Sequence, residues 1–144
     1  MTLLHDAYIA LLAGLTTRKE NEIHWEDENE NPITIEILEG ERYIVRYYWY
    51  KNGKKYCEEE YQNDQKHGKS FKLYYNGNKQ CETDYQNGQV HGKFIGWHDN
   101  GNKKWERKFQ NGQLHGKDIR WHDNGKKYFE QEYQNGKCIK TTRY

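Results

Sequence analysis

The chain of 144 residues is long enough for one domain, but its hydrophobic content of 33% lies below the ~45 to 50% usual for globular chains. This composition argues against a thick two-layer core and favours the burial of rings, since the chain has 13 Tyr, 5 Trp and 4 Phe. The net charge is +1, but residues 1–48 hold 4 Lys and Arg against 10 Asp and Glu, and residues 49–144 hold 19 against 12. We expect the acidic segment to lie against the basic one, and the alternative is a basic surface for an acidic partner.

Residues 1–31 predict a short helix followed by an acidic linker. Apolar residues recur at helical spacing over residues 3–13, and Gly14 is a suitable stop. A helix this short is marginal in water, so we expect it to dock, either on a neighbouring sheet or on another protein. No Lys or Arg precedes its apolar run, and no run approaches the ~18 residues of a membrane span. We therefore expect an intracellular, cytoplasmic protein without a membrane partner.

Residues 32–144 predict a β-repeat domain, because turn signals recur at regular intervals. A turn asparagine stands at Asn52, Asn63, Asn76, Asn87, Asn100, Asn111, Asn124 and Asn135, with spacings that alternate between 11 and 13 residues. Each precedes Gly except Asn63, and Asn-Gly is the strongest short-range hairpin signal because both residues accept the positive φ of a type I′ turn. A first hairpin is expected from Ile33 to Glu39 and from Arg42 to Tyr50. The pattern predicts a single-layer antiparallel meander of about ten strands.

Side-chain alternation predicts that the rings share one face of this sheet. The residues expected on this face are aromatic or apolar. The outgoing strands supply Cys57, Tyr61, Cys81, Tyr85, Trp105, Phe109, Phe129 and Tyr133, and the return strands are expected to add Phe71, Leu73, Ile95, Trp97, Ile119 and Trp121. A two-residue loop pairs Tyr85 with Val90, so one extra residue must be absorbed before Ile95, and we assign it to a β-bulge at His91-Gly92. Asp99-Asn100-Gly101 is expected to be a three-residue turn closing on glycine.

Ten glycines are assigned to these turns and bulges: Gly53, Gly68, Gly77, Gly88, Gly92, Gly101, Gly112, Gly116, Gly125 and Gly136.

The repeated polar residues do not predict a catalytic or metal site. His67, His91 and His115 would lie two strands apart, about 10 Å, which is too far for shared coordination of one zinc ion. The glutamates of the repeat, Glu58, Glu82, Glu106 and Glu130, have the same spacing and predict a ladder paired with Lys or Arg. Three cysteines without a C-x-x-C pair indicate neither a disulfide scaffold nor a zinc site. We therefore predict a non-enzymatic protein with no catalytic residue, no metal and no cofactor.

The stretch YQNGQVHGK from Tyr85 to Lys93 resembles the MORN repeat, in which an aromatic residue, an Asn-Gly turn and His-Gly recur at a regular period. The resemblance is closer to the variant branch, whose W-x-x-N-G-x-K-x-x-E-x-x-Y-x-N-G pattern runs from Trp97 to Gly112 and from Trp121 to Gly136. That branch includes antitoxin-like bacterial proteins and proteins of large DNA viruses. The resemblance covers residues 49–144 of this chain.

The chain departs from the MORN pattern at two kinds of position. Lys93 and Lys117 are followed by Phe94 and Asp118, where the pattern often has a further glycine. The fourth unit has no His-Gly, which we interpret as a terminal cap. The resemblance implies an elongated, twisted antiparallel sheet of about four 24-residue repeats with a scaffold role and no catalysis. If the protein is viral, its location would be the host cell or the virion.

We therefore predict a mainly β protein, with an N-terminal α-helix, that mediates protein–protein interaction and can self-associate as a homodimer. The alternatives are a nucleic-acid-binding array of basic and aromatic residues, which we consider the weaker reading, and an antitoxin-like inhibitor of a partner protein. The residues expected to contact a partner are Leu73, Tyr85, Ile95, Trp97, Trp105, Phe109, Trp121 and Phe129.

Overall fold

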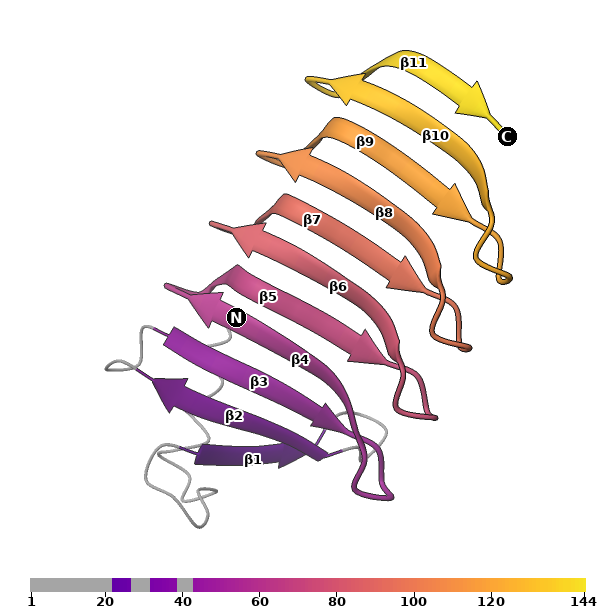
Figure 1. The fold of residues 1–144 in the computed structure, drawn as a ribbon. Helices are drawn as coiled ribbons and strands as arrows, with labels where there is room; N and C mark the ends of the chain where they lie inside the picture. Colours follow the sequence, from indigo (N-terminus) through magenta and orange to yellow (C-terminus); the bar gives the residue numbers. More distant parts are fainter. Residues whose placement is uncertain (1–21, 27–31, 39–42) are drawn as a thin grey trace.

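A computed structural model describes residues 22–26, 32–38 and 43–144, which form one antiparallel sheet of eleven strands in chain order (Figure 1). The strands are β1 (Glu22–Glu26), β2 (Pro32–Leu38), β3 (Tyr43–Trp49), β4 (Lys55–Gln62), β5 (Gln65–Leu73), β6 (Lys79–Gln86), β7 (Gln89–Trp97), β8 (Lys103–Gln110), β9 (Gln113–Trp121), β10 (Lys127–Gln134) and β11 (Lys137–Arg143). The prediction of a mainly β meander is confirmed. The helix expected at residues 3–13 lies outside the described residues.

The sheet starts one strand earlier than the sequence analysis placed it. β1 pairs with β2 in an antiparallel register that sets Glu22 opposite Glu36 and Glu26 opposite Pro32. These five residues fall in the segment expected to be a linker, and that expectation is wrong for them. Alternation is hard to recognise in a strand as short and polar as EIHWE, which explains why it escaped the sequence analysis.

The two kinds of predicted turn are both present. Asn87 and Gly88 have φ values of 49° and 80°, as a type I′ turn requires, and Asn63-Asp64 adopts the same conformation with φ values of 48° and 66°. At the other end of the strands, the His98 N–H donates to the Asn102 carbonyl at 2.8 Å. The Gly101 N–H donates back to the His98 carbonyl at 2.9 Å, which closes the expected three-residue turn on a glycine with φ 88°.

The predicted bulge at His-Gly is present but absorbs two extra residues instead of one. Tyr85 lies opposite Val90 and Thr83 lies opposite Phe94, so the one residue between them on β6 faces three residues on β7. An even number of extra residues leaves the parity of β7 unchanged. Phe94 therefore shares the face of Tyr85, and Ile95 points to the other face, which contradicts the single aromatic face that the sequence predicted.

A second bulge, of one residue, lies near the three-residue turn at the other end of the strands. It returns the odd-numbered residues of the next outgoing strand to the cysteine face. Gly96 lies opposite Trp105 and Trp97 lies opposite Lys103, so Lys104 is the extra residue. Tyr56, Gln80 and Tyr128 are the equivalent residues of the other units. The bulge places Lys103 on the face opposite to Trp105, although both have odd numbers.

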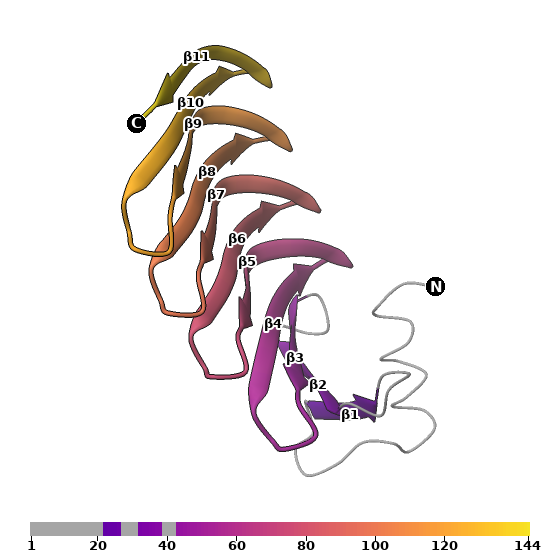
Figure 2. The same ribbon diagram turned by 90° about the vertical axis from the view of Figure 1, so that its right-hand side faces the viewer.

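The two faces of the sheet are named here by the residues that repeat on them. The cysteine face carries Cys57, Tyr61, Cys81, Tyr85, Trp105, Phe109, Phe129 and Tyr133 together with the residues opposite them. The glutamate face carries Glu58, Glu82, Glu106 and Glu130 and their opposites, Phe71, Ile95 and Ile119 among them. Figure 2 shows that the described strands form one curved layer, so each face is a separate surface.

Hydrogen bonds between equivalent turns hold successive units in register along the sheet. The ring Nδ1 of His91 accepts the Asn111 N–H at 3.2 Å, and His67 and His115 make the same contact with Asn87 and Asn135 at 3.5 and 3.4 Å. On the other edge, the side-chain amide of Asn100 donates to the Asp123 carbonyl at 2.9 Å. The histidines of the repeat therefore serve the stacking of the units.

The most deeply buried apolar side chains lie at the N-terminal end of the described sheet. They come from β2, β3 and β4: Ile33, Ile35, Ile44, Val45, Cys57 and Tyr61. Beyond β4, most side chains of the strands are only half-buried, as expected for a single layer.

Candidate interaction surfaces

The structure divides the residues that were expected to form one partner-binding face. Tyr85, Trp105, Phe109 and Phe129 lie on the cysteine face, whereas Leu73, Ile95, Trp97 and Trp121 lie on the glutamate face. The cause is the two-residue bulge at His-Gly. After this bulge, the odd-numbered residues of a return strand lie on the face opposite to the odd-numbered rings of the outgoing strand. These eight residues therefore do not share one face of the sheet.

Lysines and glutamates neutralise each other on the glutamate face. Lys55, Lys79, Lys103 and Lys127 pair with the glutamates three positions further on, Glu58, Glu82, Glu106 and Glu130. The ammonium groups of Lys79 and Lys103 also lie 5.5 and 5.7 Å from the ring centres of Trp97 and Trp121. These tryptophans are therefore already covered by cations of the chain itself.

Two of these glutamates receive a second lysine from the neighbouring strand. Lys117 and Lys127 contact Glu130 at 2.8 and 2.9 Å, and their hydrogen bonds lower the pKa of Glu130 to about 2. Hydrogen bonds from Lys79 and Lys69 likewise lower the pKa of Glu82, although partial burial opposes the shift. The ladder of paired glutamates that the sequence predicted is present.

A row of buried polar groups runs along the middle of the cysteine face. Asp118 on β9 is 1% exposed and lies between two guanidinium groups. Its carboxylate accepts hydrogen bonds from Arg107 at 3.2 Å and from Arg120 at 3.0 Å. The Arg120 guanidinium also lies 5.0 Å from the ring centre of Phe129. Two arginines hold one carboxylate, so this cluster carries a positive charge.

A second ion pair lies on the same face at β4 and β5. The Glu59 carboxylate contacts the Lys66 ammonium at 2.8 Å and accepts hydrogen bonds from the hydroxyls of Tyr48 and Tyr61 at 3.0 and 2.8 Å. Burial alone would raise the pKa of Glu59, but these hydrogen bonds outweigh it and lower the pKa. Burial raises the pKa of Tyr48 to about 12. Glu59 is therefore an ionised, fully bonded group and a poor candidate for proton transfer.

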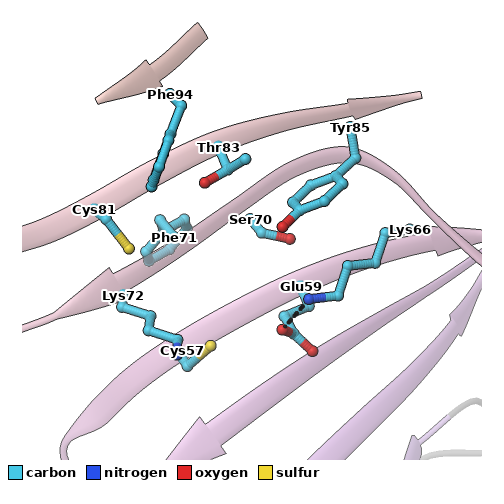
Figure 3. Close-up of a pocket in the computed structure, with 10 residues that line it drawn as sticks. All are labelled: Cys57, Glu59, Lys66, Ser70, Phe71, Lys72, Cys81, Thr83, Tyr85 and Phe94. Atoms are coloured by element: carbon cyan, nitrogen blue, oxygen red, sulfur yellow. Dashed lines mark hydrogen bonds and ion pairs between the residues drawn. The ribbon is translucent and has the colours of Figure 1, made fainter. Parts of the chain in front are cut away.

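A pocket of about 220 Å³ opens on the cysteine face beside this ion pair (Figure 3). It lies over β4, β5 and β6 and reaches Phe94 on β7. Its lining residues are Cys57, Glu59, Lys66, Ser70, Phe71, Lys72, Cys81, Thr83, Tyr85 and Phe94. Of these, Phe71 has its ring on the glutamate face, beside Lys55. The Ser70 hydroxyl is buried and has no hydrogen-bond partner among the described residues. This pocket was not predicted from the sequence.

The two cysteines of the pocket are unpaired thiols. Lys72 lies opposite Cys57 on one side and Cys81 on the other, so the two cysteines are two strands apart, about 10 Å, which is beyond the reach of a disulfide. Burial raises the pKa of Cys57 to about 11 and also raises that of Cys81. Both thiols are therefore protonated near neutral pH and weakly nucleophilic.

Among residues 22–26, 32–38 and 43–144, no group of three or more His, Cys, Asp or Glu residues is arranged to hold a metal ion. In the same part of the chain, no helix has the length and apolar character needed to cross a membrane.

No protein-family model and no curated protein matches the chain. Among solved structures, S. aureus TarM, crystallised as a mutant in complex with Fondaparinux, alpha-GlcNAc-glycerol and UDP, is similar with a TM-score of 0.41 and 12% sequence identity. The similarity covers 77% of this chain and 23% of the TarM chain. A likeness of this size carries no argument about function.

Proposed function

We propose that the chain is a non-enzymatic repeat scaffold that binds an acidic segment of a protein partner on its cysteine face. The observation that supports this proposal is the excess of cations on that face. Among the described strands, alternation gives it six cationic side chains, Arg46, Lys66, Lys72, Arg107, Arg120 and Arg143, and two anionic ones, Glu59 and Asp118. Acidic groups of a partner would be attracted to this surface.

The rings of the same face supply the apolar contact that a protein interface needs. Trp105, Phe109 and Phe129 are half-buried, and no second layer of described residues packs on them. Aromatic and arginine side chains are the residues most often found at the energetic centres of protein interfaces. The glutamate face is a weaker candidate, because most of its lysines are paired with glutamates of the chain itself.

The proposal is tested by reversing one charge on each face. Lys72 and Lys93 are both exposed and lie on return strands, but Lys72 is on the cysteine face and Lys93 is on the glutamate face. Tagged wild type, Lys72→Glu and Lys93→Glu chains are used to capture partners from a cell lysate, and the captured proteins are quantified by mass spectrometry.

A partner with an acidic segment is expected to be retained by Lys93→Glu and reduced several-fold by Lys72→Glu. Equal retention by both variants, or loss with Lys93→Glu alone, would contradict the choice of face. If the captured protein is a toxin, restored growth on co-expression tests the antitoxin-like form of the proposal. Capture of the chain by itself would identify self-association.

The cation excess also supports a nucleic-acid-binding array as the second candidate. In this reading, bases stack on rings such as Phe129 beside the Arg120 guanidinium. Titration with a single-stranded oligonucleotide at rising salt separates the two candidates, since phosphate contacts give a steep loss of affinity with salt concentration. Absence of binding at low salt would remove this candidate.

A further inference from the structure

The pocket on the cysteine face lies where β5 and β6 carry small residues and the equivalent strands one repeat later, β7 and β8, carry large ones. The units repeat every 24 residues, so Ser70 corresponds to Phe94, Cys81 to Trp105 and Thr83 to Arg107. In the third unit the ring of Trp105 lies over Gly96 and packs against Phe94, with ring centres 6.0 Å apart. The residue that corresponds to Gly96 in the earlier repeat is Lys72, which lies beside Cys81 at the edge of the pocket.

One wall of the pocket is suited to a ring. The sulfur atoms of Cys57 and Cys81 and the side chain of Phe94 surround the same space in Figure 3. Sulfur and aromatic groups both make favourable contacts with a ring edge or face. Protonated thiols add no charge to this wall.

Between these two cysteines, on β5, the pocket carries a cation that has no ion-pair partner among the described residues. Lys66 is neutralised by Glu59 at 2.8 Å, whereas the Lys72 ammonium makes no ion pair with any residue in the described part of the chain. The hydroxyls of Ser70 and Thr83 add polar groups to the pocket, and the one on Ser70 has no partner there. A bound group that carries a negative charge would pair with Lys72.

The volume limits the ligand to a single ring with few substituents. About 220 Å³ is below the ~300 to 1,000 Å³ of sites that hold drug-sized ligands. We propose that this pocket binds a small aromatic carboxylate, with its ring between Cys57, Cys81 and Phe94 and its carboxylate against Lys72. This binding is separate from the docking of a protein partner and does not depend on it.

The proposal is tested by NMR titration of the full-length chain with phenylacetate. Acetate, which lacks the ring, and phenethylamine, which has a cation in place of the carboxylate, are the matched probes. Phenylacetate is expected to shift the amide signals of β4, β5 and β6. Each matched probe is expected to bind at least ~10-fold more weakly, as the loss of one charge-assisted or apolar contact would give.

Two variants alter the lining of the pocket. Lys72→Gln removes the cation and is expected to weaken phenylacetate binding by roughly 10-fold, whereas Lys93→Gln on the other face leaves it unchanged. Ser70→Phe places a phenyl group where Phe94 stands in the next unit and is expected to abolish binding. Its control is Thr141→Phe, which adds the same ring at an exposed position of β11 on the cysteine face.

Three results would overturn the proposal: no amide shift with phenylacetate up to its solubility limit, equal affinity for phenethylamine, or unchanged binding by Lys72→Gln. The Lys72→Gln result decides the question even if Ser70→Phe does not fold, because Lys72 is exposed and makes no ion pair with a described residue.

Discussion

Substitution of Gly96 by alanine should destabilise the sheet through one steric contact. A Cβ atom at Gly96 would lie within 3.0 Å of three atoms of the Trp105 indole, which real Cβ atoms essentially never do. The indole is held in place by Phe94 at 6.0 Å and by the Arg107 guanidinium at 5.9 Å from its ring centre. Forcing a ring out of such a position costs about 1 to 3 kcal/mol. For a chain of this size, the melting temperature should fall by roughly 3 to 9 °C.

The assay is thermal unfolding followed by circular dichroism in two backgrounds. In a Trp105→Leu chain the indole is absent, so Gly96→Ala should lower the melting temperature by much less than it does in the wild type. Such non-additivity isolates the contact between the two residues. An equal decrease in both backgrounds would refute the steric argument and place the cost in the backbone of β7.

Two further predictions concern titratable groups. Because hydrogen bonds from Lys117 and Lys127 lower the pKa of Glu130 to about 2 from 4.5, Glu130 stabilises the fold above pH 4.5, and this contribution is lost as the pH falls towards 2. Unfolding by urea at a series of pH values should show a weaker dependence in this range for Glu130→Gln, and an unchanged dependence would contradict the paired geometry. Because burial raises the pKa of Cys57 to about 11 and that of Cys81 in the same direction, exposed Cys138 should react first with iodoacetamide at pH 8, as read by peptide mass spectrometry. Labelling of Cys57 at the rate of Cys138 would show that the cysteine face opens in solution.

The turns were predictable from the sequence because their chemistry is local. Asn and Gly are the residues that best accept the positive φ found at Asn87-Gly88, and the three-residue turn at Gly101 is closed by hydrogen bonds between neighbouring residues. Eight such signals at regular spacing were enough to establish the meander and its strand order. Only the short first strand, which has no turn of this kind before it, was missed.

The assignment of side chains to the two faces was wrong because the spacing of the turns gives only the net number of extra residues in a repeat. It does not say at which positions the bulges lie. A one-residue bulge at His91-Gly92 and the observed pair of bulges, one of two residues there and one of a single residue at Lys104, both fit a 24-residue unit. One contact in the structure distinguishes them. Lys103 and Glu106 are three positions apart, which in a regular strand places them on opposite faces, and their ion pair requires a bulge between them.

The pocket could be recognised only in the structure, although the repeat shows which small residues form it. Aligning the units shows Ser70 and Cys81 at positions where Phe94 and Trp105 stand one unit later. Small residues at such positions do not by themselves predict a cavity, because a neighbouring side chain can fill the space. The structure shows that Lys72 does not fill it.

Each described strand pairs only with its neighbours in the chain, and this has a consequence for how the protein acquires its structure. Contacts span at most a few tens of residues, so a hairpin anywhere along the sheet can serve as a nucleus and grow in both directions. Loss of one terminal unit by proteolysis would leave the remaining units assembled. Because the deepest burial lies at β2, β3 and β4, denaturation should proceed by fraying from the C-terminal end, with partly melted species populated before the last hairpin is lost.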